Sequence, residues 1–425
     1  MRKILQFILK ILAKMTLWRY QPVVVAVTGS VGKTSTKEAI YYTLRKRFRV
    51  RRNIKNYNNE IGVPLTILGQ DIAPAANLFG FFGWLWIILK GLANFIWSYR
   101  YPEILVLEMG ARQPGDMDYL MSFVPVKIGV LTAIGEFPVH LEFFPEKDKL
   151  IQEKATLVKS LIKDGWAILN YDDLSVRMVG DDLPEKTKII NYGFGQGADL
   201  KIANYELKIN DLEKRDLGVS FKLDFKGSIV PIKLNRALAR QQAYAATAAA
   251  AVGLCFGLNL VEISNALRKF RTLAGRTRLI KGIKNTWIID DSYNASPLAT
   301  IAALETLGEF PGRKIAVLGD MLELGNQTEI AHQQVGQKAA QVADLLFLVG
   351  ERIIFTAQAA EQEGLSQDKI FKFAQSEQAG LSLQEKLEPG DIILVKGSRS
   401  LAMEKVIKEI MAFPEKAGRL LISAN

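Results

Sequence analysis

The sequence predicts an α/β protein with a large parallel-sheet central domain, followed by a smaller, Rossmann-like α/β C-terminal domain. Short apolar runs alternate with helical segments along most of the 425 residues, which is typical of doubly wound parallel sheets. The alternation occurs in two series, separated by a β-rich stretch and an alanine-rich helix, so two sheets are expected. A chain of this length has room for two or three domains.

Residues 23–38, VVVAVTGSVGKTSTKE, predict a buried strand, a glycine loop and the start of a helix. Such a loop directs backbone N–H groups at one point, while its lysine adds a mobile charge and its threonine a hydroxyl for Mg²⁺. Val27 stands where the full motif has its first glycine, and a plain glycine turn is the alternative. We expect a P-loop-containing central domain that binds nucleotide phosphates through Gly29, Ser30, Val31, Gly32, Lys33, Thr34 and Ser35.

The first series continues with three apolar strands that end in polar or glycine-containing loops, where parallel sheets bind ligands. These strands lie within residues 102–110, 126–135 and 165–173. A β-rich flap is expected at 199–235, and helices follow at 239–257 and 261–270.

The second series begins near residues 273–276 and indicates the C-terminal domain. Its strands are expected within 286–294, 314–320, 345–351 and 391–398. The predicted organisation is an amphipathic helix at 1–19, a central domain at 20–274 with a hydrophobic insertion at 72–100, and a C-terminal domain at 275–425.

Residues 1–19 form one of two hydrophobic segments that suggest a membrane surface. Lys3, Gln6, Lys10 and Lys14 line one stripe of the expected helix, and apolar residues cover the rest. This is the pattern of a basic amphipathic helix in a membrane interface. A helix docked on its own domain is the alternative.

Residues 78–97 carry a single charge, Lys90, and could span a bilayer by hydropathy alone. One crossing would place the strands on either side of it, which belong to one sheet, on opposite sides of the membrane. An in-plane helix, a shallow hairpin or a partner-binding helix is therefore expected. Its tryptophans favour an interface, so we expect association with a membrane surface.

Bulk composition excludes some classes of site and partner. One cysteine, Cys255, and two histidines allow neither a disulfide within the chain nor a zinc site, and a reducing cytoplasm fits. The net charge of +11 suits nucleic acid, a membrane surface or anionic substrates, and six of the eight residues 45–52 are basic. We expect a cytoplasmic monomer, peripheral on the inner membrane face, that acts on small molecules and not on nucleic acid.

Several motifs together resemble the Mur ligases, the ADP-forming amide ligases of peptidoglycan assembly. The motifs are TGSVGKTS (28–35), NYNNEIGVPLTIL (56–68), EMGARQPGDM (108–117), GRTRLI (275–280), IIDDSYNASP (288–297), VLGDMLELG (317–325) with a later His332, and LVKGSRS (394–400). They look most like the branch that adds D-alanyl-D-alanine to a muramoyl tripeptide, and the resemblance covers residues 22 to 412.

The chain departs from the family at two places. Only residues 1–19 precede the phosphate loop, where the family has a domain that holds the UDP-sugar. The family's His-Asn pair before the alanine-rich helix is replaced by Gln241 and Gln242, which changes one side of the expected adenine contact.

The resemblance implies that ATP phosphorylates a substrate carboxylate and that an amine then displaces the phosphate. Lys33 would hold the phosphates, Thr34 would ligate one Mg²⁺, and Glu108 with His140 would hold a second. Lys154 matches the family lysine that CO₂ carbamylates to give an anionic metal ligand. Considered alone, Glu108 could be a helix cap, His140 a loop histidine, and Lys154 part of a solvated helix face.

The resemblance also implies roles for residues of the C-terminal domain. Arg276 would reach the phosphates, Asp291 would bind the ribose and Asn294 would lie near the reacting groups. Substrate would be contacted by Asn58, Asn59, Lys396, Ser398 and Arg399. An ordinary ion pair at a helix start is the alternative for Arg399.

Two other functions stay open. A ligase of this kind could act on a lipid-linked or poly-γ-glutamate-type acceptor; the lipid II amidating subunit usually carries a four-cysteine zinc module, which one cysteine excludes here. The chain could instead be a P-loop ATPase or scaffold at the membrane, but the set Glu108, His140 and Lys154 would then have no purpose.

Overall fold

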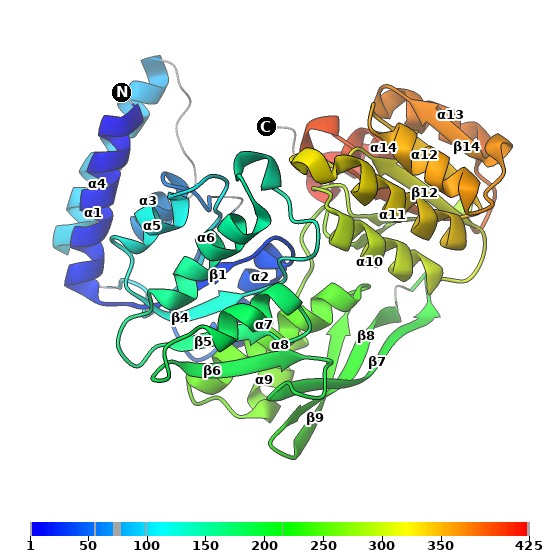
Figure 1. The fold of residues 1–425 in the computed structure, drawn as a ribbon. Coiled ribbons are helices and arrows are strands. Elements are labelled where there is room, and N and C mark those ends of the chain that lie inside the picture. Colours follow the sequence, from blue (N-terminus) through cyan, green and yellow to red (C-terminus); the bar gives the residue numbers. More distant parts are fainter. Residues whose placement is uncertain (1, 55–56, 71–77, 98–99, 215, 423–425) are drawn as a thin grey trace.

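The computed structural model describes residues 2–54, 57–70, 78–97, 100–214 and 216–422, which form two β-sheets with helices on their faces (Figure 1). Parts of the predicted insertion, at 72–77 and 98–99, and the chain end at 423–425 lie outside the described residues. The predicted fold class, a large parallel-sheet domain followed by a second α/β domain, is confirmed.

The first sheet has nine strands in the order β2-β3-β1-β4-β5-β6-β7-β8-β9. Neighbouring strands from β2 to β7 run parallel, and β8 and β9 extend the sheet as antiparallel strands, so the β-rich flap expected at 199–235 continues this sheet. The strands are β1 Val23–Thr28, β2 Val50–Arg52, β3 Ile104–Glu108, β4 Val126–Leu131, β5 Trp166–Asn170, β6 Lys188–Gly193, β7 Leu200–Asp211, β8 Asp216–Phe225 and β9 Ser228–Asn235.

Helices cover both faces of the parallel part of this sheet, which explains its almost continuous apolar strands. One face packs against α2 Lys33–Leu44, α8 Arg240–Cys255 and α9 Leu260–Leu267. The other packs against α3 Gly62–Ile67, α5 Asp116–Met121, α6 Lys147–Lys159 and α7 Leu174–Asp181. The alanine-rich sequence of α8 gives it small, fully buried side chains along the face that contacts α2.

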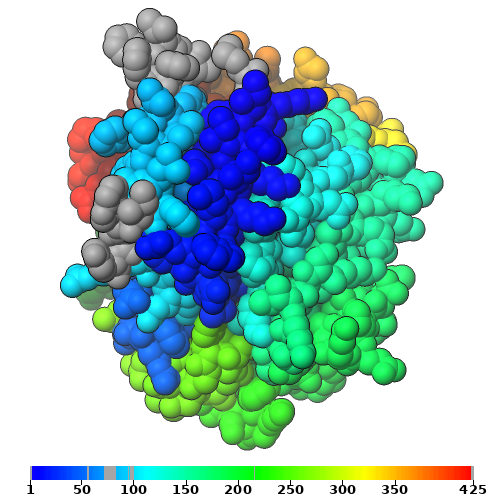
Figure 2. Space-filling view, turned by 90° about the vertical axis from the view of Figure 1, so that its left-hand side faces the viewer, coloured from blue at the N-terminus to red at the C-terminus, as the bar shows by residue number. Residues whose placement is uncertain are grey.

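The two hydrophobic segments form α1 Arg2–Tyr20 and α4 Leu78–Trp97, which lie side by side on one face of the molecule (Figures 1 and 2). Leu9 and Leu12 of α1 and Ile87 of α4 are buried in a cluster with Leu65 and Leu68. α1 is therefore docked on its own domain, as the alternative interpretation expected. Among the described residues, no helix combines the length and hydropathy needed to cross a bilayer.

The docked helices keep an exposed apolar surface as well as a buried one. On α1, Ile4, Phe7, Ile11 and Trp18 are exposed, and on α4 the same holds for Leu85, Trp86, Leu89 and Leu92. The predicted polar stripe of α1 is divided: Lys3 and Lys14 face solvent, whereas Lys10 donates to Ser122 Oγ at 2.7 Å and Gln6 donates to Glu60. We call the eight exposed apolar residues the α1/α4 surface.

The second sheet has six strands in the order β10-β11-β15-β12-β13-β14, parallel except for β10. These are β10 Arg278–Lys281, β11 Trp287–Asp290, β12 Lys314–Gly319, β13 Leu345–Val349, β14 Ile370–Phe373 and β15 Ile392–Lys396. The helices are α10 Pro297–Gly308, α11 Thr328–Val342 and α12 Ile353–Gln362 on one face and α13 Ser376–Lys386 and α14 Glu404–Ile410 on the other, with α15 Ala417–Leu420 at the end. Short 3₁₀ turns are η1 Leu141–Phe143, η2 Ile283–Asn285, η3 Gly325–Gln327, η4 Gln367–Lys369, η5 Arg399–Leu401 and η6 Pro414–Lys416.

The two parts of the chain share an apolar core. Leu217 of β8 and Leu238, which precedes α8, are buried in the cluster formed by α10, α11 and the second sheet. The connection between the parts is fixed as well, because the Gly275 N–H donates to the buried carboxylate of Asp290 at 2.9 Å. Burial raises the pKa of Asp290, and its hydrogen bonds with Ser292 and Gly275 oppose that rise.

The docking of α1 gives the first prediction. Leu9→Ala removes a fully buried side chain and should lower the free energy of unfolding of the central domain by about 2 to 5 kcal/mol. Phe7→Ala, in the same helix but 62% exposed, should change it by less than about 0.5 kcal/mol. Urea unfolding, together with hydrogen exchange of the α1 amides, measures both. Equal effects of the two substitutions would contradict the docked position of α1.

Candidate functional site

The glycine loop lies at the carboxyl end of β1, between the ends of β3 and β4. Gly29 has φ +140°, and a Cβ there would lie 2.1 Å from Thr132 Oγ1, so a side chain does not fit. Gly32, at φ +91°, turns the chain into α2. The N–H groups of Ser30 and Val31 donate to the Ala133 carbonyl at 2.8 and 3.0 Å, which anchors the loop to the end of β4.

The first N–H groups of α2 have no partner within a helix and carry its positive dipole end, so this end of α2 suits an anion. Lys33 begins the helix and folds back over the loop, where its Nζ donates to the carbonyls of Gly29 at 2.7 Å and Ser30 at 3.1 Å. Burial lowers the pKa of Lys33, and the nearby charge of Glu108 opposes this shift. Thr34 is buried and Ser35 half-buried in the same turn.

Arg276 connects the C-terminal domain to this turn. Its Nη2 donates to Thr34 Oγ1 at 3.4 Å, and its positive charge contributes to lowering the pKa of Lys33. The guanidinium also stacks on the Tyr293 ring at 4.0 Å. The structure therefore brings Arg276 to the phosphate loop across the two domains.

Glu108 ends β3 and is almost completely buried beside the loop. Asn53 fixes its backbone through hydrogen bonds of 2.8 and 3.0 Å, and Asn58 Nδ2 donates to its Oε1 at 3.0 Å. Among the residues that the structure describes, none hydrogen-bonds the other carboxylate oxygen, Oε2. The nearest ion-pair partner of that atom is Lys37 Nζ, at 3.9 Å.

A buried carboxylate oxygen without a hydrogen bond, next to a phosphate loop, fits Mg²⁺. This ion binds proteins through one or two carboxylates and completes its octahedron with water and substrate phosphates. Among the described residues, no cluster of three His, Cys, Asp or Glu side chains could hold a metal ion by itself. The chemistry of the Glu108 carboxylate and of the Thr34 hydroxyl therefore fits ligands of Mg²⁺.

His140 lies at the start of η1, with its Nδ1 2.5 Å from Glu323 Oε2 of the C-terminal domain. Burial lowers the pKa of His140, and the positive charges of Lys154 and Lys33 contribute, while Glu323 opposes the shift. The hydrogen bond to His140 lowers the pKa of Glu323. The two shifts lower the pKa of both groups, and the short contact joins the His140 ring to the Glu323 carboxylate.

Lys154 is the fully buried member of a group of five lysines between 147 and 163. Burial, assisted by the charge of Lys33, lowers its pKa to about 7. A solvated helix face is therefore wrong for this lysine. The charge of Lys33 lowers the pKa of both Lys154 and His140, and the charge of Glu108 opposes the lowering of the Lys33 pKa, so these groups influence one another electrostatically.

The other predicted residues of the C-terminal domain are occupied within that domain. Lys396 Nζ contacts Asp291 Oδ2 at 2.5 Å and the Asn294 carbonyl at 2.9 Å. Ser398 Oγ accepts from the Leu322 N–H at 3.0 Å, and Arg399 forms a 2.8 Å ion pair with Glu404, as its alternative interpretation expected.

The two asparagines predicted to contact substrate, in the asparagine-rich loop, make different contacts. Asn58 contacts Glu108, but Asn59 Oδ1 accepts from the N–H groups of Gly62 and Ile61 and so caps α3. Of the glutamine pair, Gln242 Oε1 accepts from the Ala239 N–H and caps α8. Gln241 instead lines a pocket beside the phosphate loop.

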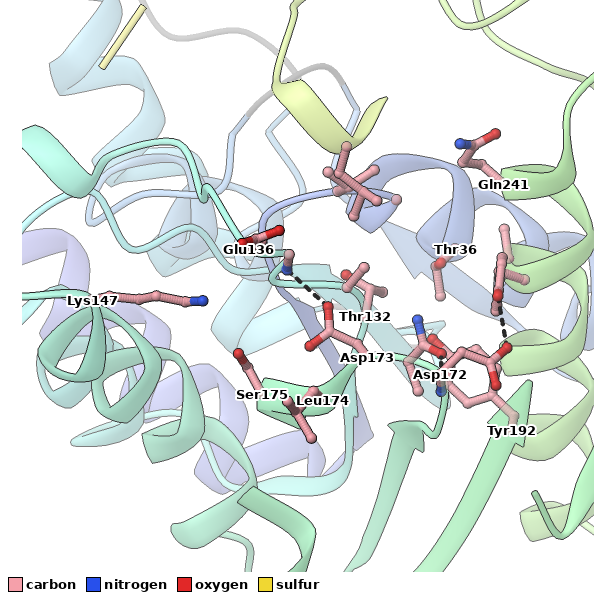
Figure 3. A pocket seen from close by; sticks show the side chains of 18 residues that line it. Thr36, Thr132, Glu136, Lys147, Asp172, Asp173, Leu174, Ser175, Tyr192 and Gln241 are labelled. Atoms are coloured by element: carbon pink, nitrogen blue, oxygen red, sulfur yellow. Dashed lines mark hydrogen bonds between the residues drawn. The ribbon is translucent and has the colours of Figure 1, made fainter. Parts of the chain in front are cut away.

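This pocket has a volume of about 590 Å³ and opens between the loop and the carboxyl ends of β4, β5 and β6 (Figure 3). Asp172 and Asp173, which follow β5, form part of its wall. Asp173 accepts from the N–H groups of Ile134 and Gly135, both at 2.8 Å, and Asp172 accepts from the Tyr244 hydroxyl at 2.7 Å. Both carboxylates hold the pocket's loops in place.

Several residues of the site have no counterpart among the predicted ones. Lys37 and Asn53 support Glu108, and Glu323 contacts His140. Lys37 lies one helical turn after Lys33 on the same face of α2, a spacing that could have indicated it. For Asn53 and Glu323 no local pattern exists, because their partners are distant in sequence.

Comparison with known proteins agrees with this geometry. Residues 27–72 and 95–253 match the "Mur ligase middle domain", and residues 275–399 match the "Mur ligase, glutamate ligase domain". The first match omits 73–94, which include most of α4.

Relatives and solved structures give the same family. A "UDP-N-acetylmuramoyl-tripeptide--D-alanyl-D-alanine ligase" of Bacillus subtilis is 29% identical over 95% of this chain and 79% of its own length. MurF of Acinetobacter baumannii has a TM-score of 0.77 at 26% identity, covering 95% of this chain and 80% of its own. MurF ligase of Thermotoga maritima, solved with ADP, has a TM-score of 0.75 at 25% identity, covering 97% and 84%.

The resemblance expected from the motifs is thus confirmed: the chain belongs to the Mur ligase family and is similar to its MurF members.

Proposed function

We propose that the protein is an ATP-dependent, ADP-forming amide ligase that joins D-alanyl-D-alanine to a muramoyl tripeptide. The observation that carries the proposal is the Oε2 atom of Glu108, to which no described residue donates a hydrogen bond. This carboxylate ends β3 beside the glycine loop that leads into α2, whose first residues are Lys33 and Thr34. The substrates are those in the names of the relatives of similar sequence. The division into a central domain at 20–274 and a C-terminal domain at 275–425 is supported by the two sheets and the two family matches.

The reaction has two steps. A carboxylate oxygen of the acceptor attacks the γ-phosphorus of ATP, and ADP leaves. The amine of the dipeptide then attacks the acyl carbon, inorganic phosphate leaves, and the amine loses a proton. Because charge spreads over the transferring phosphoryl oxygens, positioned cations supply most of the catalysis.

The chain's own residues divide this work. Lys33 and the N-terminus of α2 would hold the phosphates from the central domain, and Arg276, which contacts Thr34, would hold them from the C-terminal domain. Thr34 would hold one Mg²⁺ and Glu108 with His140 a second, and these ions would supply neutralisation of the phosphate charge. Asp291 is assigned to the ribose and Asn294 to the reacting groups, while Asn58, Lys396, Ser398 and Arg399 are assigned to substrate. The 590 Å³ pocket beside the loop takes the nucleoside.

Lys154 is assigned as a carbamate. Its complete burial close to Lys33 and His140 suits a carboxylate better than a second ammonium, because neighbouring like charges in a desolvated site repel. A neutral amine adds to CO₂ and releases one proton, which gives the anionic group. That group would face the metal ions from α6.

The α1/α4 surface supports peripheral attachment of a monomer to a membrane. Exposed tryptophans at positions 18 and 86 lie among exposed aliphatic residues, with Lys3, Lys14 and Lys90 nearby in sequence on the same two helices. Amphipathic side chains of this kind prefer the lipid headgroup region. This surface also favours the second candidate function, a ligase whose acceptor is lipid-linked.

Lys33→Ala should reduce ADP release by about 10²-fold or more, because a preorganised charge at the transferring phosphoryl group is lost. An ADP-release assay with a muramoyl tripeptide and D-alanyl-D-alanine measures this, and thermal unfolding verifies the fold. The control is Lys149→Ala, an exposed lysine of α6 that should retain full activity. Near wild-type turnover by Lys33→Ala would show that the phosphate-loop assignment is wrong.

Lys154→Ala should lose activity that acetate or another short-chain acid partly restores, since a free carboxylate can occupy the space of the carbamate. Lys159→Ala, an exposed lysine on the same helix, should neither lose activity nor respond to acid. Mass spectrometry after trapping of the carbamate gives an independent reading. Unchanged activity of Lys154→Ala would rule out the assignment.

Attachment to membranes should depend on the α1/α4 surface. Replacing Phe7, Trp18 and Trp86 by Ser, all exposed, should abolish flotation with anionic vesicles and leave the unfolding transition unchanged. Salt should weaken flotation of the wild type, because about 1 kcal/mol per basic residue near the surface is electrostatic. Replacing exposed Met178 and Ile229, on other elements, is the matched control. A wild type that stays unbound at low salt would refute the attachment.

A further inference from the structure

Glu323 joins the two domains through both oxygens of one carboxylate. It lies between β12 and η3 of the C-terminal domain and contacts two side chains of the central domain. Its Oε2 lies 2.5 Å from His140 Nδ1, and its Oε1 accepts from Arg112 Nη2 at 2.9 Å. The side chain of Arg112 is 65% exposed, whereas those of Glu323 and His140 are 29% and 26% exposed.

The backbone at this contact is constrained on both sides. His140 and Glu323 have φ values of +73° and +63°, in the left-handed region that residues with a side chain adopt only where the surroundings impose it. The Glu142 N–H donates to the Glu323 carbonyl at 3.4 Å, and Gly325 lies next to the Glu142 backbone, where a Cβ would make ordinary van der Waals contact. Backbone and side chain of Glu323 therefore engage the same turn, η1.

The side-chain contact decides which nitrogen of His140 is available. A carboxylate at Nδ1 holds the proton on that atom and leaves Nε2 with its lone pair. Histidines that bind metals usually donate their second ring N–H to a carboxylate or carbonyl, which fixes the ring and raises its basicity. Glu323 makes this contact with His140 from another domain.

We propose that Glu323 is a positioning residue that orients His140 for Mg²⁺, so that the second metal site is complete only when the C-terminal domain is docked. The proposal rests on the metal role assigned to His140 above. Domain docking and metal binding are then linked, and each strengthens the other by the same factor. Arg112 holds the second oxygen of the carboxylate, but its side chain is 65% exposed, and an exposed ion pair of this kind adds little to docking.

Binding of Mn²⁺ to the full chain with ADP present, followed by electron paramagnetic resonance, tests the proposal. Glu323→Ala should weaken one of the two binding steps by about 10- to 100-fold. Glu323→Gln, whose amide oxygen can still accept from Nδ1–H, should bind closer to wild type. Arg112→Ala, which breaks the exposed half of the same contact, should leave Mn²⁺ affinity nearly unchanged. ADP affinity without metal should be equal in all variants.

Three outcomes contradict the inference in distinguishable ways. If His140→Ala weakens Mn²⁺ binding but Glu323→Ala does not, the positioning role is wrong and the metal role stands. If Arg112→Ala weakens binding as much as Glu323→Ala, the carboxylate acts only as an ion pair between domains. If His140→Ala has no effect, the metal role in the proposed function is wrong, and the positioning role is wrong with it.

Discussion

Parallel pairing of β1 with both β3 and β4 is the constraint on which the site depends. The registers place Val27 opposite Glu108 and Thr28 opposite Leu131. The glycine loop that follows β1 therefore emerges between the end of β3, with its carboxylate, and the end of β4, with its anchoring carbonyl. Because parallel strands end at one edge of a sheet, three segments distant in sequence bring the loop, the Glu108 carboxylate and the pocket wall to one place.

Residues whose placement follows from a position at or after a strand end could be predicted from the sequence. Lys33, Thr34 and Glu108 directly follow or end buried apolar runs, and the structure has them together. Residues whose role depends on a distant partner could not. His140 and Glu323 are 183 residues apart, and the pairing of Lys396 with Asp291 also joins two strand ends that no local pattern links. Asn59 illustrates another limit, since an asparagine can serve a ligand or cap a helix with equal chemistry.

The N-terminal helix shows why hydrophobic periodicity alone did not decide between a helix in a membrane interface and a helix docked on its own domain. A helix that is apolar on most sides can bury one face against its own domain and still expose another. Leu9 and Trp18 occupy these two faces of α1. The lysine stripe did not identify the exposed face of the helix either, because Lys10 donates a hydrogen bond to Ser122 whereas Lys14 is exposed to solvent. Only the three-dimensional packing against α3 and α4 separates the two faces.

The apolar core shared between the two parts of the chain restricts how the enzyme moves. Leu217 of the antiparallel flap is sealed inside the second sheet's core, far along the chain from the phosphate loop. Separating the domains there would expose hydrocarbon to water, and so would separating them at Val139, which adjoins His140 and belongs to the same cluster. We therefore expect the shared core to limit how far the two domains can separate. For the same reason the C-terminal part, expressed alone, would expose the apolar residues that Leu217 covers and would tend to self-associate.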